Sequence, residues 1–298
     1  MPLVTSIVVN YRGLDDTRQC VQSLLASSYE RHSVVVVDNA SPSGDADRLS
    51  AEFGDRVHVI AAGTNLGYGG GANLGLRWSL AQHAAYAWVL NNDTTVDPTC
   101  IQQLVDAMEL NLGYGVLSPQ ISAPIGPEAP VGIWYSGGRI LLERAETRHS
   151  FRRIEGAGVV ETEYITGCAM FIRCASLANI GLFWEPLFLF WEDVDLSLRM
   201  RRSGWELGVV PNALIHHRIH GSIVSRTLEY YHFRNAVIIV RKFGSRSALV
   251  SGLCCLIGGV ARRWARALLR RKPAPTAATR GLLVGIVLAF TTRWVKTA

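Results

Sequence analysis

Short apolar runs alternate with amphipathic helical stretches through the first 120 residues of this chain, and few architectures accommodate that alternation. Residues 34–37 are four consecutive valines, as expected of a strand that is covered on both faces. Strands separated by helices pair in parallel, because the helix carries the chain back across the sheet. We therefore predict an α/β fold with a doubly wound, mostly parallel sheet. The expected strands are residues 5–9, 34–37, 57–61 and 86–90, and the expected helices are residues 15–26 and 72–83.

The second half of the body shows a different pattern. Residues 122–158 are rich in proline and glycine and predict loops with a short hairpin. Residues 163–173 predict another strand, interrupted at Gly167, where backbone can approach a ligand closely. An aromatic stretch at residues 183–191 then precedes a helix that we expect at residues 192–202.

Polar side chains follow four of the predicted strands at the point where each strand ends. In open α/β sheets ligands bind beyond the carboxyl ends of the strands. Four polar strand ends at one edge support a binding site more strongly than any one of them does. They are Asn10 and Tyr11, Asp38 and Asn39, Asn65, and Asn91 with Asn92 and Asp93.

The cluster Asn91, Asn92 and Asp93 comes directly after an apolar run that predicts a buried strand. Amide and carboxylate oxygens are hard ligands, which suit Mg²⁺ or Mn²⁺ while the ion holds the phosphates of a ligand. The same residue types are ordinary in turns, and Asp97 with Pro98 suits the start of a helix. The cluster alone therefore leaves open a cation site and a plain turn.

Residues 65–73 form a glycine-rich segment, NLGYGGGAN, that leads into a helix. The segment contains a G-x-G-x-x-A string, so a dinucleotide-binding oxidoreductase has to be considered. That fingerprint belongs in the first strand-to-helix turn, whereas this segment follows the third strand. The segment still offers backbone N–H groups and a helix N-terminus to a phosphate or a sugar, and the alternative is tight-turn geometry alone.

An acidic pair opens the helix that we expect after the aromatic stretch. Asp193 suits an N-cap, and Asp195 with Arg199 suits an ion pair on the helix surface. Glu192 and Asp193 also follow aromatic residues that would wall a cleft, and paired carboxylates there can provide a general base. The residues alone leave both interpretations open.

Three histidines, His216, His217 and His220, lie within five residues. A histidine beside a strand end could complete a metal shell with Asp93. The sequence has no HExxH motif and no cysteine partner for a zinc hydrolase, and it has neither a GxxxxGK[ST] loop nor a GxSxG elbow.

The net charge of +6 conceals an asymmetry along the chain. Thirteen of the 30 Lys and Arg residues follow Glu229, whereas no acidic residue does. Apolar runs at residues 248–261 and 281–290 are each shorter than the roughly 20 residues that cross a bilayer, and arginines lie between them. This basic amphipathic pattern suits a membrane interface, and packing on the body or on a second subunit is the alternative. A nucleic-acid partner is disfavoured, because no binding motif accompanies the basic residues.

The cysteines and the N-terminus indicate the compartment. The six cysteines form no CxxC pair and no Cys/His zinc spacing, so we expect no disulfides and no structural zinc, in a reducing compartment. No positively charged region precedes the first apolar run, so we expect a first strand there rather than a signal peptide. The cysteines are Cys20, Cys100, Cys168, Cys174, Cys254 and Cys255.

Seven segments follow one another in an order that is typical of one family. They are TSIVVNYRG, VVVVDNAS, NLGYGGGANLGL, LNNDTTVD, ITGCAMFIR, WEDVDLSLRMRRSGW and VPNALIHHRIHGS. This succession resembles the inverting family 2 glycosyltransferases of the GT-A fold, most closely the rhamnosyltransferase-like branch that builds bacterial cell-surface polysaccharides. The resemblance covers residues 4–243 and includes YYHFRNAVIIVRKFG. It implies a glycosyltransferase domain at residues 1–243. Residues 244–298 match no motif of the family, and their basic, apolar pattern predicts a helical tail that leans on a membrane surface or another subunit.

The resemblance also implies roles for single residues. Asp93 would be the main ligand of Mg²⁺ or Mn²⁺ and His217 the second, with His216 as the alternative. The family's DXD position is here Asn91, Asn92 and Asp93, which departs from a strict DXD because the first acid is an amide. Asp193 would be the catalytic base, and Glu192 and Trp191 would bind the acceptor. The implied donor contacts are Asn10, Tyr11, Asp38, Asn65, Gly67, Asn73, Asn92 and Asp93.

The function that the resemblance implies is an inverting transfer of a sugar from a nucleotide-sugar donor to a glycan acceptor. The resemblance favours dTDP-L-rhamnose as donor, although UDP-hexoses, UDP-N-acetylhexosamines and UDP-galactofuranose use the same framework. The implied acceptor is a polysaccharide or a polyprenyl-diphosphate-linked glycan, and the implied location is cytoplasmic, on the inner face of the plasma membrane. The sequence leaves open whether the protein forms a homo-oligomer. The alternative function is a catalytically silent nucleotide-sugar-binding subunit, against which the presence of Asp93, Glu192, Asp193 and His217 together argues.

Overall fold

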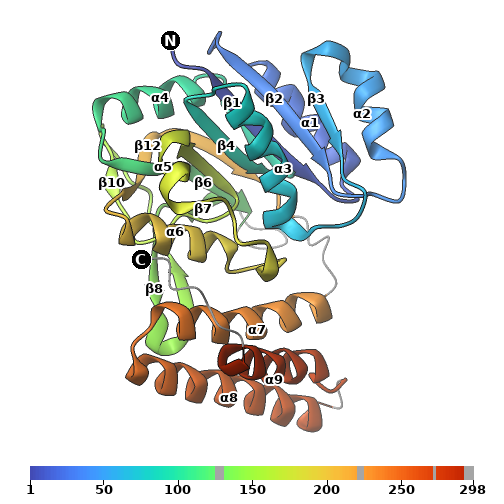
Figure 1. Ribbon diagram of the computed structural model, residues 1–298, viewed down its shortest axis with the longest axis vertical. Helices are drawn as coiled ribbons and strands as arrows, with labels where there is room; N and C mark the ends of the chain where they lie inside the picture. The colour runs from blue at the N-terminus through green and yellow to red at the C-terminus, as the bar shows by residue number, and fades with distance from the viewer. Residues whose placement is uncertain (125–130, 220–224, 271–272, 292–298) are drawn as a thin grey trace. The chain divides into compact units, whose positions relative to one another are not determined.

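The computed structural model describes residues 1–124, 131–219, 225–270 and 273–291, and its contacts divide the chain into two compact units (Figure 1). The sheet unit comprises Met1–Arg139, His149–Pro186 and Glu192–Ser222. The helical unit comprises Ile140–Arg148, Leu187–Trp191 and Ile223–Ala298. The predicted division after residue 243 stays a proposal. His220 and the Gly221-Ser222 pair that follows it lie outside the described residues.

The first half of the sheet is parallel, as the alternation of strands and helices predicts. Its strands lie in the order β3, β2, β1, β4, and β1 pairs in parallel with both β2 and β4. Valines of β2 and isoleucine and valine of β1 fill the core between the sheet and its helices. The bounds are β1 Val4–Asn10, β2 His32–Asp38, β3 His58–Ala61 and β4 Tyr86–Asn91.

The second half of the sheet is mixed. Strand β11 (Ala169–Arg173) runs antiparallel to both β4 and β6 (Tyr114–Pro124). Strand β12 (Glu206–His217) then pairs in parallel with β6, and the short strand β5 (Thr94–Val96) pairs antiparallel with β12. The remaining strands are β7 Val131–Tyr135 on β6, β10 Val160–Glu161 on β12, and the two-stranded sheet of β8 Gly138–Leu141 and β9 Glu146–His149.

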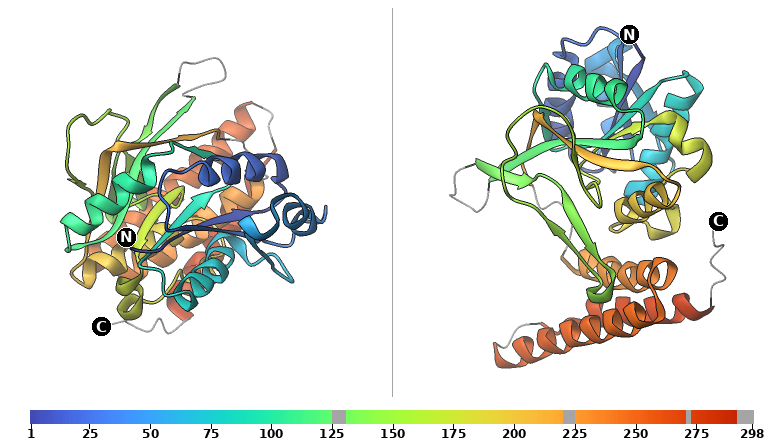
Figure 2. Two further views of the ribbon diagram at one scale, coloured as in Figure 1. Left: turned by 90° about the horizontal axis from the view of Figure 1, so that it is seen from above. Right: turned by 90° about the vertical axis from the view of Figure 1, so that its left-hand side faces the viewer.

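Helices cover both faces of the sheet, with α1 and α3 on opposite sides of β1 (Figure 2). Helix α6 begins at Glu192, where the sequence predicted a helix, and α4 begins at Cys100, shortly after Asp97 and Pro98, which suit a helix start. Helices α2 and α5 were not predicted. The helices of the sheet unit are α1 Leu14–Leu25, α2 Asp45–Phe53, α3 Gly67–Ala81, α4 Cys100–Leu110, α5 Cys174–Ile180 and α6 Glu192–Arg202. Short 3₁₀ turns occupy Gly54–Arg56, Leu142–Arg144 and Glu185–Leu187.

The glycine-rich segment is helical rather than a bend, because α3 begins at Gly67 and not near residue 72. A Cβ on Gly75 would lie 2.3 Å from Cγ2 of Ile7, and a Cβ on Gly71 would lie 2.9 Å from Cγ1 of Val9. These glycines therefore let α3 lie directly on β1, and this close packing offsets the poor helix propensity of glycine.

Three helices make up most of the helical unit: α7 Ser225–Phe243, α8 Arg246–Leu269 and α9 Thr276–Thr291. Helix α9 packs closely on α7, because a Cβ on Gly281 or Gly285 would lie within 2.7 Å of a backbone oxygen of α7. The side chain of Ser245 caps α8 by accepting a hydrogen bond from the backbone N–H of Ala248. Helix α8 extends past the apolar run at residues 248–261, and by length and composition alone it is long enough to cross a membrane.

Candidate active site

Asn10, at the end of β1, organises the first polar strand ends. Strand pairing sets Asn10 opposite Asp38, and the Asn10 amide donates to Asp38 Oδ1 (2.8 Å), Ser41 Oγ (3.2 Å) and Asp45 Oδ2 (3.0 Å). The Asn10 carbonyl accepts from the Thr17 hydroxyl at 2.8 Å. Every polar group of this fully buried side chain is thus engaged by the protein. Asn10 orients Asp38 and Asp45, and its direct contact with a donor stays a prediction.

Asp45 is a buried carboxylate that the sequence analysis missed. Burial raises its pKa, but hydrogen bonds from Asn10, Ser43 and Ser41 outweigh burial and hold the pKa below its ordinary value. Asp45 is the first residue of α2 and follows Ser43 and Gly44, a pattern typical of a helix start. That helix was not predicted, and so its acidic first residue was not considered.

The start of α3 is held by Asn39, which follows β2. The Asn39 amide donates to Gly67 O (2.9 Å) and Asn65 Oδ1 (3.2 Å), and its carbonyl accepts from the backbone N–H of Leu66 (3.0 Å). Asn65 and Gly67 therefore lie at the N-terminal end of α3, beside the end of β2. Tyr11 is exposed, with the Arg12 guanidinium 5.1 Å from the centre of its ring.

Asn73 joins α3 to the segment that leads toward α6. Its amide donates to Phe183 O and Glu185 Oε1, both at 2.9 Å, and its carbonyl accepts from the backbone N–H of Phe183 at 3.0 Å. The side chain is buried within the sheet unit. The observed contacts of Asn73 are therefore structural, and its direct contact with a donor stays a prediction.

Strand pairing brings Asp93 and His217 together. Antiparallel pairing of β5 with β12 sets His217 opposite Thr94, and the backbone N–H of Arg218 donates to Asp93 O at 2.9 Å. His217 Nε2 lies 3.0 Å from Asp93 Oδ1. His216 lies next to His217 on β12 and points to the other side of the strand, where Nδ1 is 3.4 Å from Ser122 Oγ.

Asp93 and His217 provide a donor set that a divalent cation can use. A carboxylate oxygen and an imidazole nitrogen lie side by side, and His217 Nδ1 is buried with no hydrogen-bond partner among the described residues. The described part of the chain holds no group of three or more His, Cys, Asp and Glu side chains around one point. The residues thus fit a cation that takes two protein ligands and completes its shell with oxygens of a bound diphosphate and water. The neighbouring Asn92 amide donates to Thr17 Oγ1 at 3.0 Å.

Asp193 lies in the first turn of α6 and is held by backbone N–H groups. Its Oδ2 accepts from Gly167 at 2.9 Å, and its Oδ1 accepts from Val194 at 2.8 Å. Gly167 is the glycine at which the sequence predicted a close approach of backbone and ligand. In the structure the N–H of Gly167 is directed at the Asp193 carboxylate. Asp193 itself remains partly exposed.

Burial acts on the pKa of both neighbouring carboxyl groups, Glu192 and Asp193. Burial, followed by the charge of Asp193, raises the pKa of Glu192 to about 8. Burial also raises the pKa of Asp193, but the N–H groups of Gly167 and Val194 favour its charged form. A pKa of about 8 favours a proton on Glu192 at neutral pH, and the two backbone N–H groups favour the negative charge on Asp193, an arrangement in which neighbouring acids can take different roles. Glu192 Oε2 is buried and has no hydrogen-bond partner in the described part of the protein.

The Glu192 pKa predicts a change in stability with pH. In the unfolded chain this carboxyl titrates near 4.5, so the folded protein binds its proton more tightly and loses free energy of unfolding as the pH rises from 4.5 through about 8. We expect Glu192→Gln to lose less stability over this range than the wild type does. Urea denaturation at intervals from pH 5 to pH 9 measures the difference. Glu161→Gln, at an exposed position, is the control, and equal pH dependence of wild type and Glu192→Gln would show that Glu192 is ionised in the fold.

Backbone hydrogen bonds link the two acidic sites of the sheet unit: the N–H of Asn91 donates to Cys168 O at 3.0 Å, and the N–H of the preceding residue, Gly167, binds Asp193. Tyr68 lies at the same place, and burial, followed by nearby charges that include Glu192, Asp193 and Asp93, raises the pKa of its hydroxyl. The same hydroxyl donates to the carbonyl of Gly167, the residue whose N–H binds Asp193. Tyr68 was not among the predicted site residues, although an aromatic residue inside the glycine-rich segment marks it in the sequence.

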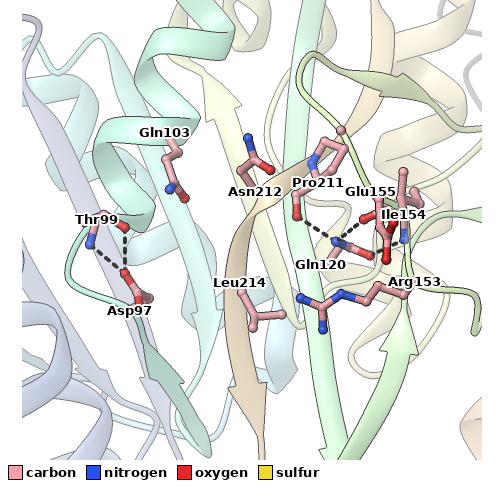
Figure 3. Close-up of a pocket in the computed structure, with 11 residues that line it drawn as sticks. Asp97, Thr99, Gln103, Gln120, Arg153, Ile154, Glu155, Pro211, Asn212 and Leu214 are labelled. Atoms are coloured by element: carbon pink, nitrogen blue, oxygen red, sulfur yellow. Dashed lines mark hydrogen bonds between the residues drawn. The ribbon is translucent and has the colours of Figure 1, made fainter.

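A separate polar cavity of about 510 Å³ lies where β12 and β6 face the loop around residue 154 (Figure 3). None of the predicted site residues lines it. The Gln120 amide donates to Pro211 O at 2.6 Å and to Ile154 O at 3.0 Å, so it holds the loop to the sheet. Asp97, on the other wall, accepts from the hydroxyl and the backbone N–H of Thr99. These polar groups bind one another, which favours a structural role for this cavity.

Trp191, predicted to bind an acceptor, belongs to the helical unit. Its ring is buried and lies 5.9 Å from the ring of His232. Its contact with an acceptor stays a prediction.

Comparison with solved structures identifies the fold. A crystal structure of GalNAc-T7 with UDP, GalNAc and Mn²⁺ matches with a TM-score of 0.65 at 15% sequence identity, over 80% of this chain and 48% of that one. This chain therefore spans about half the length of that protein. The agreement, together with the mixed sheet and its helices, confirms the predicted α/β GT-A fold.

Comparison with sequences identifies the family. The low-salt glycan biosynthesis hexosyltransferase Agl10 of Haloferax volcanii is 26% identical over 253 residues, which are 81% of this chain and 76% of the relative. The N-acetylglucosaminyl-diphospho-decaprenol L-rhamnosyltransferase of Mycobacterium tuberculosis is 25% identical over 242 residues, 72% and 76% of the two chains. The model of the family described as glycosyl transferase family 2 matches residues 5–177. The chain therefore belongs to glycosyl transferase family 2, and its relatives include rhamnosyl- and hexosyltransferases.

Proposed function

We propose that this protein transfers a sugar from a nucleotide-sugar donor to a glycan hydroxyl, with inversion at the anomeric carbon. The observation that carries the proposal is the Asp193 carboxylate, which is partly exposed beside Glu192 and accepts hydrogen bonds from two backbone N–H groups. These N–H groups favour the charged form of Asp193. A positioned carboxylate of this kind is what the deprotonation of an acceptor hydroxyl requires.

The reaction is a single displacement. Asp193 takes the proton of the acceptor hydroxyl as its oxygen bonds to the anomeric carbon, and the bond from that carbon to the donor phosphate oxygen breaks. The electron pair of the broken bond leaves with the nucleoside diphosphate. Glu192, protonated beside Asp193, can donate a hydrogen bond to the acceptor and spares Asp193 a second negative charge at close range.

Asp93 and His217 would hold Mg²⁺ or Mn²⁺ in this mechanism. A divalent cation bound there supplies Lewis-acid stabilisation of the negative charge on the diphosphate. The side chains themselves are placed by the pairing of β5 with β12, which fixes the two ligands relative to each other before any donor arrives.

The donor is proposed to lie along the carboxyl ends of the parallel strands. Asp38 and Tyr11 would contact the base and ribose, and Asn65, Gly67 and Asn92 would contact the diphosphate and sugar, with Asn10 and Asn73 holding these groups in place. The relative named as an L-rhamnosyltransferase of a decaprenol-linked substrate supports L-rhamnose as the transferred sugar and a polyprenyl-diphosphate-linked glycan as the acceptor, and dTDP-L-rhamnose is the donor that we propose.

A donor screen tests the proposal. We expect one dTDP- or UDP-sugar to raise the unfolding temperature in the presence of Mn²⁺, because a ligand that binds only the folded state stabilises it. The same sugar nucleotide should be hydrolysed slowly, with release of nucleoside diphosphate. Binding without hydrolysis or transfer to any glycan acceptor would favour a catalytically silent subunit instead.

We also propose that the helical unit binds an anionic membrane surface, which would place the enzyme on the inner face of the plasma membrane. Large apolar side chains on α8 and α9 are exposed, and those on α9 are spaced four and three residues apart, on one face of the helix. Exposed arginines accompany them on α8, and the chain after Glu229 has no acidic residue to oppose binding of anionic headgroups. The apolar residues are Val250, Ile257, Leu268, Leu283, Val287 and Phe290, and the arginines include Arg262 and Arg266.

Vesicle binding tests the membrane proposal. We expect the protein to sediment with phosphatidylglycerol vesicles more than with phosphatidylcholine vesicles and to be released by salt, because each basic side chain near an anionic surface contributes about 1 kcal/mol. The double variant Leu268→Glu with Leu283→Glu should lose this binding. Leu110→Glu, at an equally exposed apolar position of the sheet unit, is the matched control. A double variant that binds vesicles normally but changes oligomeric state would identify the surface as a subunit contact.

A further inference from the structure

The backbone N–H that binds Asp193 Oδ2 belongs to a tight turn of the sheet unit. The backbone N–H of Ala169 donates to Thr166 O at 3.3 Å, which closes a four-residue turn with Gly167 as its second residue. Because glycine has no Cβ, its own sterics restrict the backbone least. The direction of the Gly167 N–H therefore depends on the groups that hold this glycine in place.

Tyr68 of α3 holds Gly167 from the side opposite Asp193. The Tyr68 hydroxyl donates to Gly167 O, and the Gly167 N–H donates to Asp193 Oδ2 at 2.9 Å. A Cβ on Gly167 would lie 3.4 Å from Cε1 of Tyr68 and 3.5 Å from Cβ of Asp193, so the glycine lies in contact between the two side chains. Hydrogen bonds thus fix the peptide groups on both sides of the Gly167 Cα.

The Tyr68 ring is held by contacts other than that hydrogen bond. Tyr68 is the second residue of α3 and packs against the hydrophobic core of the sheet unit. Its ring meets the ring of Phe183 edge to face, with ring centres 6.4 Å apart. The ring should therefore stay in place when only the hydroxyl is removed.

We propose that Tyr68 is a positioning residue for Asp193. Its hydroxyl holds the Gly167 carbonyl, the held glycine directs its N–H at the Asp193 carboxylate, and that bond sets where the carboxylate meets the acceptor hydroxyl. All three residues belong to the sheet unit. This inference rests on the proposed role of Asp193 as base. It goes beyond that role because it assigns to a side chain of the glycine-rich segment a task at the base rather than at the donor.

The variant Tyr68→Phe tests the proposal, because it keeps the ring and removes only the donor to Gly167 O. We expect faster hydrogen exchange in residues 166–169. We also expect a kcat about 10-fold lower, because loss of one hydrogen bond displaces the base less than the misplacement that costs about 10²-fold. The Kd of the donor with Mn²⁺ should not change, because Asn39 holds the start of α3.

The pH profile is a readout that a purely structural role of Tyr68 would not move. The Gly167 N–H favours the charged form of Asp193, so a loosened Gly167 should raise the pKa of Asp193 further. The rise of kcat/KM with pH should therefore shift to higher pH in Tyr68→Phe. The variant removes no charge, because the raised pKa of the Tyr68 hydroxyl keeps it neutral. The titratable groups around this hydroxyl are Cys168, Glu192, Asp193 and Asp93.

The double variant of Tyr68→Phe with Asp193→Asn decides whether Tyr68 acts through Asp193. Residues that act through one another have effects that do not add. Tyr68→Phe should therefore lower the single-turnover rate of the wild type and leave the residual rate of Asp193→Asn unchanged. An equal loss in both backgrounds would overturn the proposal.

Tyr29→Phe is the matched control. Tyr29 is buried, and its hydroxyl donates to the backbone carbonyl of Pro2 at 2.7 Å, near the start of β1 and not at the polar end that carries Asn10. We expect this variant to keep the wild-type kcat, pH profile and exchange in residues 166–169.

Two further results would count against Tyr68. The proposal is overturned if Tyr68→Phe exchanges normally in residues 166–169, or if this turn loosens while kcat and the pH profile stay at their wild-type values. Failure of the wild-type chain to transfer any sugar would overturn the proposed function instead, and the exchange experiment would still report whether Tyr68 holds the turn.

Discussion

Asp193→Asn is expected to lower kcat by about 10²–10⁴-fold and to leave the Kd of the donor unchanged. Asparagine has nearly the same shape but cannot take the proton of an acceptor hydroxyl. Its carbonyl can still accept a hydrogen bond from Gly167 or Val194, so we expect the variant to fold. Single-turnover transfer measures the rate, and calorimetry with Mn²⁺ measures the donor affinity.

The pH profile adds a second test of the same residue. Because only the charged form of Asp193 can act as base, kcat/KM of the wild type should rise with pH through the pKa of Asp193, which burial raises. That rise should disappear in Asp193→Asn. Glu192→Gln should keep it, because Glu192 already carries its proton below about pH 8. Normal turnover by Asp193→Asn together with inactive Glu192→Gln would assign the base to Glu192.

Asp93→Asn is expected to abolish the dependence of donor binding on Mn²⁺. The change keeps the size of the side chain and removes the charge that would hold the cation next to His217. Loss of a residue that only supports a metal ligand typically lowers metal affinity by about 10–100-fold, so loss of a ligand should cost at least that much. Calorimetric titration of the donor with and without Mn²⁺ measures directly how much the cation changes the Kd of the donor.

Asp97→Asn is the control for Asp93→Asn. Asp97 is an exposed carboxylate four residues further along the chain, and its hydrogen bonds are with Thr99 in the same turn. We expect the Asp97→Asn variant to bind the donor with the same affinity as the wild type. A donor Kd that responds to Mn²⁺ equally in wild type and Asp93→Asn would remove Asp93 from the cation site.

The sequence predicted the parts of the fold that depend on local pattern. The valine run of β2, the alternation of strands with helices, and the start of α6 at Glu192 follow from hydrophobic periodicity and from acidic residues at a helix start. The polar strand ends were also predicted to meet, because parallel strands end at one edge. The structure places Asn10 opposite Asp38 as that argument requires.

Features that depend on contacts between distant residues could not be predicted in the same way. The sequence analysis placed Gly67 and Gly69–Gly71 before the helix, and only the position of Val9 on β1 shows why Gly71 is needed within α3. The roles of Asn10 and Asn73 could not be seen either, because an amide that binds a ligand and one that binds buried backbone are the same residue in a sequence. The positive φ angle of Phe188 was equally hidden, since Asn235, which binds the carbonyl groups of the flanking Leu187 and Leu189, lies far later in the sequence.

The pair formed by Asp93 and His217, which we propose as cation ligands, has a further property that follows from the ladder between β5 and β12. Backbone hydrogen bonds, not side-chain packing, decide which β12 residue stands beside Asp93. A slip of one residue would replace the imidazole of His217 with the side chain of His216 or Arg218, and no intermediate arrangement exists between these alternatives. Insertions or deletions within β12 should therefore remove cation affinity as a whole, while conservative changes on the surface of the strand should leave it untouched.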